Sequence, residues 1–120
     1  MYTVEEGLRK LCAKVFELFS EADPARFPEF GKFRPFIYQL QYPGTDYLGV
    51  MKISYSDEDR AERFFSVGVR HMASDMLISN FLFSGTNQEI LDWMKTEEAL
   101  SEVVSTIMTL KPDLESRLND

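Results

Sequence analysis

The sequence predicts an α+β fold: an N-terminal helix, a four-stranded antiparallel meander sheet, and C-terminal helices packed on one face of that sheet. Apolar residues recur at helical spacing at both ends of the chain, whereas between Phe36 and Phe83 the spacing changes to two. Short turn sequences separate the alternating segments, and consecutive strands joined by short turns pair antiparallel. Helices must then cover one face of the sheet to bury its apolar side.

The first helix is expected to begin at a capping box, in which the Thr3 and Glu6 side chains bond the free amides of the first turn. Asp23-Pro24 is expected to end it, because the residue before a proline disfavours helical angles. Its apolar stripe comprises Val4, Leu8, Leu11, Cys12, Val15, Phe16, Leu18 and Phe19.

Four strands are expected, over residues 36–42, 47–55, 64–72 and 76–83. Pro43-Gly44 forms the first turn, because proline presets one central angle and glycine tolerates a positive φ at the other. On the third strand Phe65, Val67 and Val69 share one face. The fourth segment has two readings, since a short apolar run fits either a strand or a buried helical turn.

A second capping box, formed by Thr86 and Glu89, starts the C-terminal helical region. Apolar residues then continue at helical spacing to Leu110, and Thr96 is expected to divide the region into a short helix and a longer one. Pro112 is expected to end the longer helix, leaving residues 113–118 for a final turn. Residues 24–35, with Pro24, Pro28, Gly31 and Pro35, are expected to be irregular.

Composition and charge limit the classes of function. With 120 residues, 44% of them hydrophobic, the chain is expected to form one domain over residues 1–120 that needs neither a disulfide nor a metal ion. The net charge of −7 lies entirely in residues 57–120, which would repel a polyanion, so no nucleic-acid partner is expected. No segment is long and apolar enough for a membrane span, and the lone Cys12 fits a reducing compartment. We therefore expect a cytoplasmic protein without a membrane partner.

No catalytic motif or cofactor fingerprint is present in the sequence. His71 is the single histidine and is expected to be a partly exposed residue at the end of a strand, while Cys12 is expected to be a core thiol. The acidic run 57–59 lacks the spacing of a calcium loop, and residues 84–87 lack the second glycine and the lysine of a phosphate loop. The sequence therefore predicts a protein that is not an enzyme and has no cofactor or metal site.

Two aromatic features are candidates for partner binding. Residues 26–36 interleave phenylalanines with basic residues, which either cover one end of the core or receive a partner. Tyr38, Tyr42, Tyr47 and Tyr55 lie on the first two strands, where they form an exposed patch unless helices pack over that face. The predicted partner-binding residues are Phe27, Phe30, Lys32, Phe33, Arg34, Tyr38 and Tyr42.

The function that these features favour is a small acidic protein-interaction module, of the adaptor, binding-chaperone or immunity-inhibitor type. The alternative is a small-ligand-binding domain with an apolar pocket between the helices and the sheet. The open edges of the first and last strands favour a homodimer. The basic segment 26–36 provides a further hypothesis, contact with the acidic C-terminal surface of a second copy.

Overall fold

The helices and strands follow one another in the predicted order. The computed structural model describes residues 3–21, 36–55 and 62–119, and within these ranges it contains three helices and four strands. The strands form one sheet in which each pairs antiparallel with the next. They are β1 (Phe36–Gln41), β2 (Tyr47–Tyr55), β3 (Arg63–His71) and β4 (Leu77–Gly85). The predicted α+β class is confirmed, and residues 77–85 are a strand rather than a helical turn.

Helix α1 (Val4–Glu21) begins at the predicted capping box, with the Glu6 amide donating to Thr3 Oγ1 at 3.1 Å and the Thr3 amide donating to Glu6 Oε2 at 3.3 Å. Val4 and Leu18 were assigned to the apolar stripe by spacing, but both are exposed. Leu18 is turned roughly 100° from the centre of the buried stripe at 3.6 residues per turn, and Val4 sits in the first turn. The buried side chains of the helix are Leu8, Cys12, Val15, Phe16 and Phe19.

Two helices follow the sheet, α3 (Asn87–Met94) and α4 (Glu97–Leu118). The Glu89 amide donates to Thr86 Oγ1 at 3.2 Å, and the Thr86 amide donates to Glu89 Oε1 at 3.1 Å, so the second capping box is also present. Thr96 is the N-cap of α4, with its hydroxyl accepting from the Ala99 amide at 3.1 Å. Thr96 therefore divides the two helices as predicted.

The prediction that Pro112 ends the last helix is wrong, because α4 continues through it to Leu118. A proline inside a helix removes one backbone hydrogen bond and crowds the preceding turn. Burial on both sides compensates for that loss, since Leu110 is 6% exposed and Leu114 is fully buried. Ion pairs between Lys111 and Glu115, at 2.7 Å, and between Arg117 and Asp113, at 3.4 Å, also span this part of the helix.

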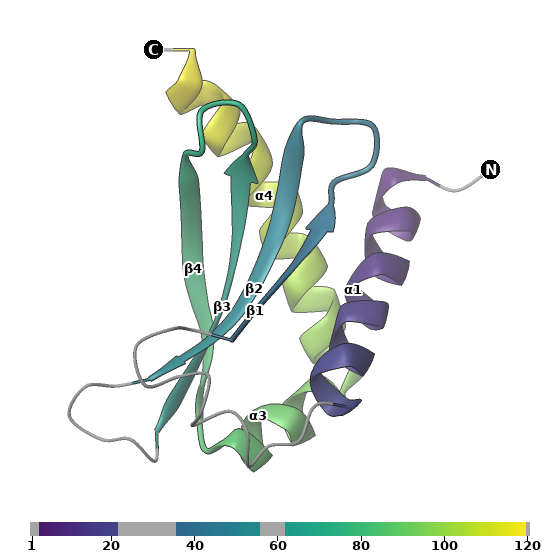
Figure 1. Ribbon diagram of the computed structural model, residues 1–120. Helices are drawn as coiled ribbons and strands as arrows, with labels where there is room; N and C mark the ends of the chain where they lie inside the picture. The colour runs from purple at the N-terminus through teal and green to yellow at the C-terminus, as the bar shows by residue number, and fades with distance from the viewer. Residues whose placement is uncertain (1–2, 22–35, 56–61, 120) are drawn as a thin grey trace.

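The helices lie together on one face of the sheet (Figure 1). Helix α4 crosses β3 and β4, while α1 lies beside α4 and packs against β1. Arg9 joins the two long helices, since it forms an ion pair with Glu97 and donates to Ser101 Oγ at 3.2 Å. Beneath them the ring of Phe65 is surrounded by aromatic rings, with centroids 6.3 Å from Phe16, 6.0 Å from Phe19 and 5.3 Å from Trp93. The opposite face of the sheet is covered by none of the helices described, and it is called the open face below.

Candidate functional site

A β-bulge in β4 decides which phenylalanines reach the open face. Phe65 pairs with Phe83, but the next residue, Ser66, pairs with Phe81, so Leu82 is an extra residue in β4. Without the bulge, Phe81 and Phe83 would share a face, because side chains alternate along a strand. Instead Phe83 stacks on Trp93 under the helices, with centroids 5.0 Å apart, while Phe81 is 72% exposed on the open face.

Three cross-strand rows make up most of the open face. Their order follows from the register of the four strands. The rows are Ile37–Lys52–Ser66–Phe81, Gln39–Val50–Gly68–Ser79 and Gln41–Leu48–Arg70–Leu77. Of these, Ile37 and Phe81 are large apolar side chains with high exposure.

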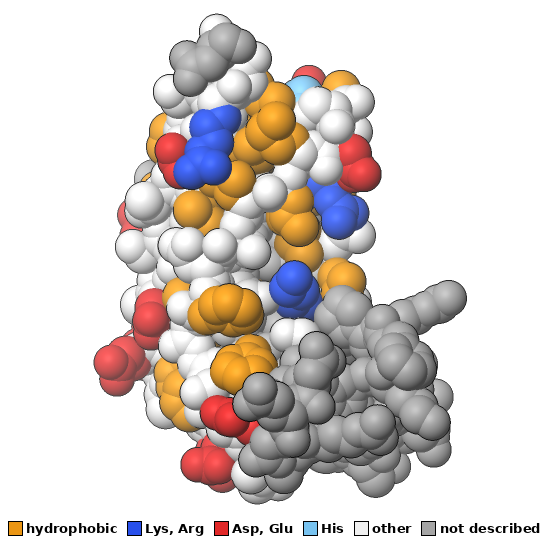
Figure 2. Space-filling view, turned by 90° about the vertical axis from the view of Figure 1, so that its left-hand side faces the viewer, with side chains coloured by type: hydrophobic (Ala, Val, Ile, Leu, Met, Phe, Trp, Pro, Cys, Tyr) orange, Lys and Arg blue, Asp and Glu red, His pale blue; other side chains and the backbone are white. Residues whose placement is uncertain are grey.

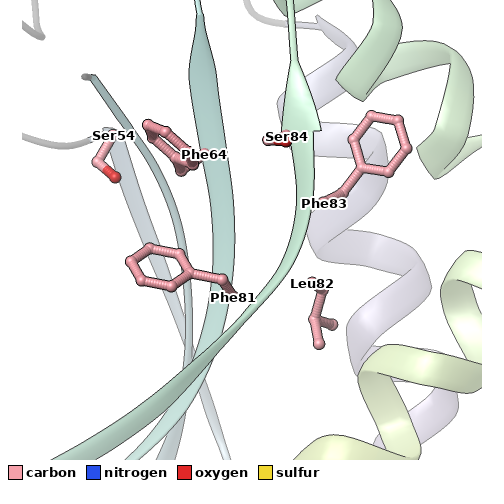
Figure 3. A pocket seen from close by; sticks show the side chains of 6 residues that line it. All are labelled: Ser54, Phe64, Phe81, Leu82, Phe83 and Ser84. Atoms are coloured by element: carbon pink, nitrogen blue, oxygen red, sulfur yellow. The ribbon is translucent and has the colours of Figure 1, made fainter. Parts of the chain in front are cut away.

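A groove lies beside Phe81 at one end of this face. Phe64 and Phe81 meet edge to face there, with ring centroids 5.8 Å apart, while Phe83 points to the other side of β4, toward the helices (Figure 3). The groove has a volume of about 780 Å³. Its described lining is Ser54, Phe64, Phe81, Leu82, Phe83 and Ser84. Aromatic rings that are held in place and exposed are typical anchor positions for a binding partner.

Charged side chains on the open face are basic. At the described strand positions of this face, Lys52 and Arg70 carry charge and no carboxylate is present. Arg70 Nη1 donates to Gln39 Oε1 on β1 at 3.2 Å, and its Nε lies 3.5 Å from Asp75 Oδ1 in the β3–β4 turn. Because β2 lies between β1 and β3, Arg70 crosses the face above Val50, which is 3% exposed. Seen from the side on which β4 lies, apolar side chains form separate patches along the middle of the molecule, with both basic and acidic side chains beside them (Figure 2).

Two small residues at the centre of the open face are closely packed. Ser66 is 2% exposed, and its hydroxyl has no hydrogen-bond partner among the described residues. At Gly68 an added Cβ would lie 2.5 Å from the carbonyl oxygen of Ile78, so β3 and β4 approach each other more closely there than a side chain permits. The middle of β3 on this face therefore consists of small residues in close contact with β4.

The two residues with reactive side chains, His71 and Cys12, lie at a strand end and in the core. His71 is half-buried at the end of β3, its Nδ1 lies 2.8 Å from Ser74 Oγ, and its ring is 5.0 Å from that of Tyr47. Cys12 is fully buried, and burial raises the pKa of its thiol to about 12. Both residues match their predicted surroundings. A thiol with so high a pKa stays protonated and is a poor nucleophile near neutral pH.

Tyr38, Tyr42 and Tyr47 lie on the covered face. Tyr42 is 8% exposed, and Tyr38 packs edge to face on Phe19 of α1, with centroids 4.7 Å apart. The ammonium of Lys111 on α4 lies 5.3 Å from the ring centroid of Tyr42 and 5.0 Å from that of Tyr47. Of the two alternatives for this set, helix packing is therefore the one present for Tyr38, Tyr42 and Tyr47.

Most of the predicted partner-binding segment lies outside the described residues. This applies to Phe27, Phe30, Lys32, Phe33 and Arg34, and also to the acidic run 57–59. Their binding role stays a prediction.

The remaining candidate sites offer less for binding than the open face. At the start of α3, the side chains of Thr86 and Glu89 each accept a hydrogen bond from the other residue's backbone amide. These bonds form the predicted helix cap. In the described ranges no cluster of three or more His, Cys, Asp or Glu side chains is placed to hold a metal ion. None of the helices described has both the length and the apolar character needed to cross a membrane. A second groove of about 410 Å³ lies between α1 and the start of α4, where Glu17, Glu21 and Glu97 are among its lining residues.

The sequence contained part of the signal for the open-face site. Phe64 directly precedes the core residue Phe65, so a strand must turn Phe64 to the opposite face. Lys52 and Arg70 follow from the same alternation once the register is known. The face of Phe81 could not be assigned in this way. Simple alternation would place Phe81 on the same face as Phe83, whereas the bulge places it on the opposite face.

The fold and this site define an α+β protein with a helix-covered sheet and an apolar, basic open face. No family model matches the chain, and no match to it occurs among the curated proteins or the solved structures.

Proposed function

We propose that this protein is a non-enzymatic protein-interaction module that binds its partner on the open face of the sheet. The observation that carries the proposal is the position of Phe81, which the bulge turns away from the core and leaves 72% exposed. Exposure of a large aromatic side chain to water is unfavourable, and burying it against a partner lowers the free energy. Phe64 holds the ring from one side, so little side-chain entropy is lost on binding.

The surroundings of Phe81 support protein binding over catalysis. The face offers apolar area, two basic side chains and serine hydroxyls, which are the components of a protein–protein interface. The reactive side chains elsewhere, Cys12 and His71, are engaged in the core and in a turn. A cytoplasmic location belongs to the same proposal and is supported by the single, unbridged cysteine.

Photo-crosslinking tests this proposal directly. Benzoylphenylalanine in place of Phe81, in the cells that make the protein, should give a crosslinked product that mass spectrometry assigns to a different protein. The matched control places the same residue at Ser105, an exposed position on α4. Equal crosslinking from both positions would contradict the proposal.

A small-ligand-binding domain is the second candidate, because the groove beside Phe81 has a volume within the range of ligand pockets, about 300–1,000 Å³. It differs from the expected pocket between helices and sheet, since Phe64 and Phe81 line it from the open face. Mass spectrometry of denatured, freshly purified protein distinguishes the two functions. A bound small molecule that is lost in Phe81→Ser would favour the ligand-binding domain.

A further inference from the structure

The open face has a charge opposite in sign to that of the whole protein. The chain carries a net charge of −7, yet the described strand positions of this face hold two cations and no carboxylate. A surface of this kind attracts groups that the rest of the molecule repels, because complementary charge steers association and rejects wrong partners.

The two cations are available to different degrees. Lys52 is half-buried, and none of the described carboxylates forms an ion pair with it. Arg70 is held by its hydrogen bond to Gln39, and its ion-pair partner Asp75 is an exposed turn residue whose side chain is 82% accessible. A carboxylate from a partner could replace Asp75 without moving the guanidinium.

The spacing of the cations sets the geometry of a complementary partner. Lys52 pairs with Ser66, and Arg70 lies four positions further along β3. At about 3.3 Å per residue along a strand and about 5 Å between strands, the two Cα atoms are about 14 Å apart. Between them lies the row that contains Val50 and Gly68, which has no charged residue. The complementary surface therefore has two acidic groups with apolar or small side chains between them.

We infer that the open face binds an acidic, apolar segment of a partner protein, whose carboxylates pair with Lys52 and Arg70 while an apolar side chain packs on Phe81. An extended segment fits this spacing, because its residues i and i+4 lie on one side and are about 13 Å apart. The inference rests on the proposed function and adds the chemistry of the partner. A second copy fits poorly, since two open faces brought together would place four cations and no strand carboxylate in one interface.

A displayed library of random peptides of about 12 residues, selected on the immobilised full-length protein, tests the inference. Enriched peptides should be rich in Asp and Glu alternating with apolar residues. Their affinity, measured by fluorescence anisotropy, should fall about tenfold or more in Lys52→Glu and should fall as salt is raised from about 50 to about 300 mM. Lys95→Glu is the matched control, because it makes the same charge reversal at a residue between α3 and α4. The affinity of this variant for the peptides should stay within about twofold of the wild-type value.

Asp75→Asn gives a result that apolar docking alone would not produce. Asparagine tolerates the positive φ of 60° at this position but no longer competes for Arg70, so acidic peptides should bind about threefold more tightly. Lys52→Gln, which removes the charge but keeps the first two methylenes of the side chain, replaces Lys52→Glu if the charge reversal prevents folding.

The outcomes separate the two proposals. Peptides that need Phe81 but show no acidic excess would overturn the inference and leave the proposed function standing. A library that yields no peptide sensitive to Phe81→Ser would overturn both. Dimerisation that depends on Phe81, seen by sedimentation, would assign the face to a second copy and also overturn the inference.

Discussion

Phe81 and Phe83 form a matched pair whose substitution by alanine tests the β-bulge, on which the candidate site depends. About a quarter of Phe81 is covered, since its residue exposure is 72%. For an aromatic side chain this is on the order of 50 Å², so Phe81→Ala should lower the free energy of unfolding by about 1 kcal/mol at most.

Phe83 has the opposite environment. It packs against the core and stacks on Trp93 with an interplanar angle of 10°. Truncation of a packed phenylalanine removes transfer free energy and leaves a cavity, so Phe83→Ala should cost about 3 kcal/mol. The two substitutions should therefore differ by about 2 kcal/mol, although both remove the same atoms from the same strand.

Urea denaturation followed by circular dichroism measures both changes, with equal m-values as the check that the unfolded states are comparable. Trp93 is the single tryptophan of the chain and gives a second signal. Its native emission should change in Phe83→Ala and stay unchanged in Phe81→Ala. Equal losses of stability, or a larger loss for Phe81, would refute the bulge and with it the assignment of the open face.

Three further predictions concern packing and ionisation. Gly68→Ala should lower the free energy of unfolding by about 2–3 kcal/mol, because its Cβ would meet the Ile78 carbonyl at 2.5 Å. Gly7→Ala in α1 should instead raise the free energy of unfolding by about 0.5–1 kcal/mol, and urea denaturation of both variants checks the contrast. Ser66→Ala should raise the free energy of unfolding by about 1 kcal/mol, since it removes a buried hydroxyl without a partner, and a loss of stability in the same assay would show that the hydroxyl is bonded. The folded-state pKa of Cys12, about 12, is above its value of about 9 when exposed, so its stabilising contribution is complete below pH 9 and declines as pH rises toward 12. The stability difference between wild type and Cys12→Ala should therefore shrink above about pH 9, and a constant difference would contradict the raised pKa.

Local patterns accounted for most of the fold. Both capping boxes form as expected, because each joins residues only three positions apart and depends on no distant contact. The period of two identified the first three strands, whereas the fourth segment also fitted a helical turn and proved to be a strand. The prediction for Pro112 is wrong because the local pattern contains the cost of a proline in a helix but not the burial of Leu114, which only the packed structure supplies.

The candidate site was less predictable than the fold. Tyr38 and Tyr42 were chosen as partner-binding residues from alternation, which says that residues share a face but not which face the helices cover. In the structure α1 and α4 cover that face, with Tyr38 packed on Phe19 and Lys111 over the ring of Tyr42. The aromatic pair on the other side of the sheet is instead Phe64, which is half-buried, and Phe81, which is exposed.

Over the described residues, the sequence by itself determined the order and the type of most elements, because hydrophobic period, caps and turns are properties of neighbouring residues. Tertiary structure alone decided which face of the sheet stays open, and that Phe81 lies on it while Phe83 does not. The physical reason has two parts. A bulge exists only in the pairing of one strand with its neighbour, and a face is covered only when helices distant in sequence pack on it. Both conditions depend on contacts across the fold, which no local window of the chain contains.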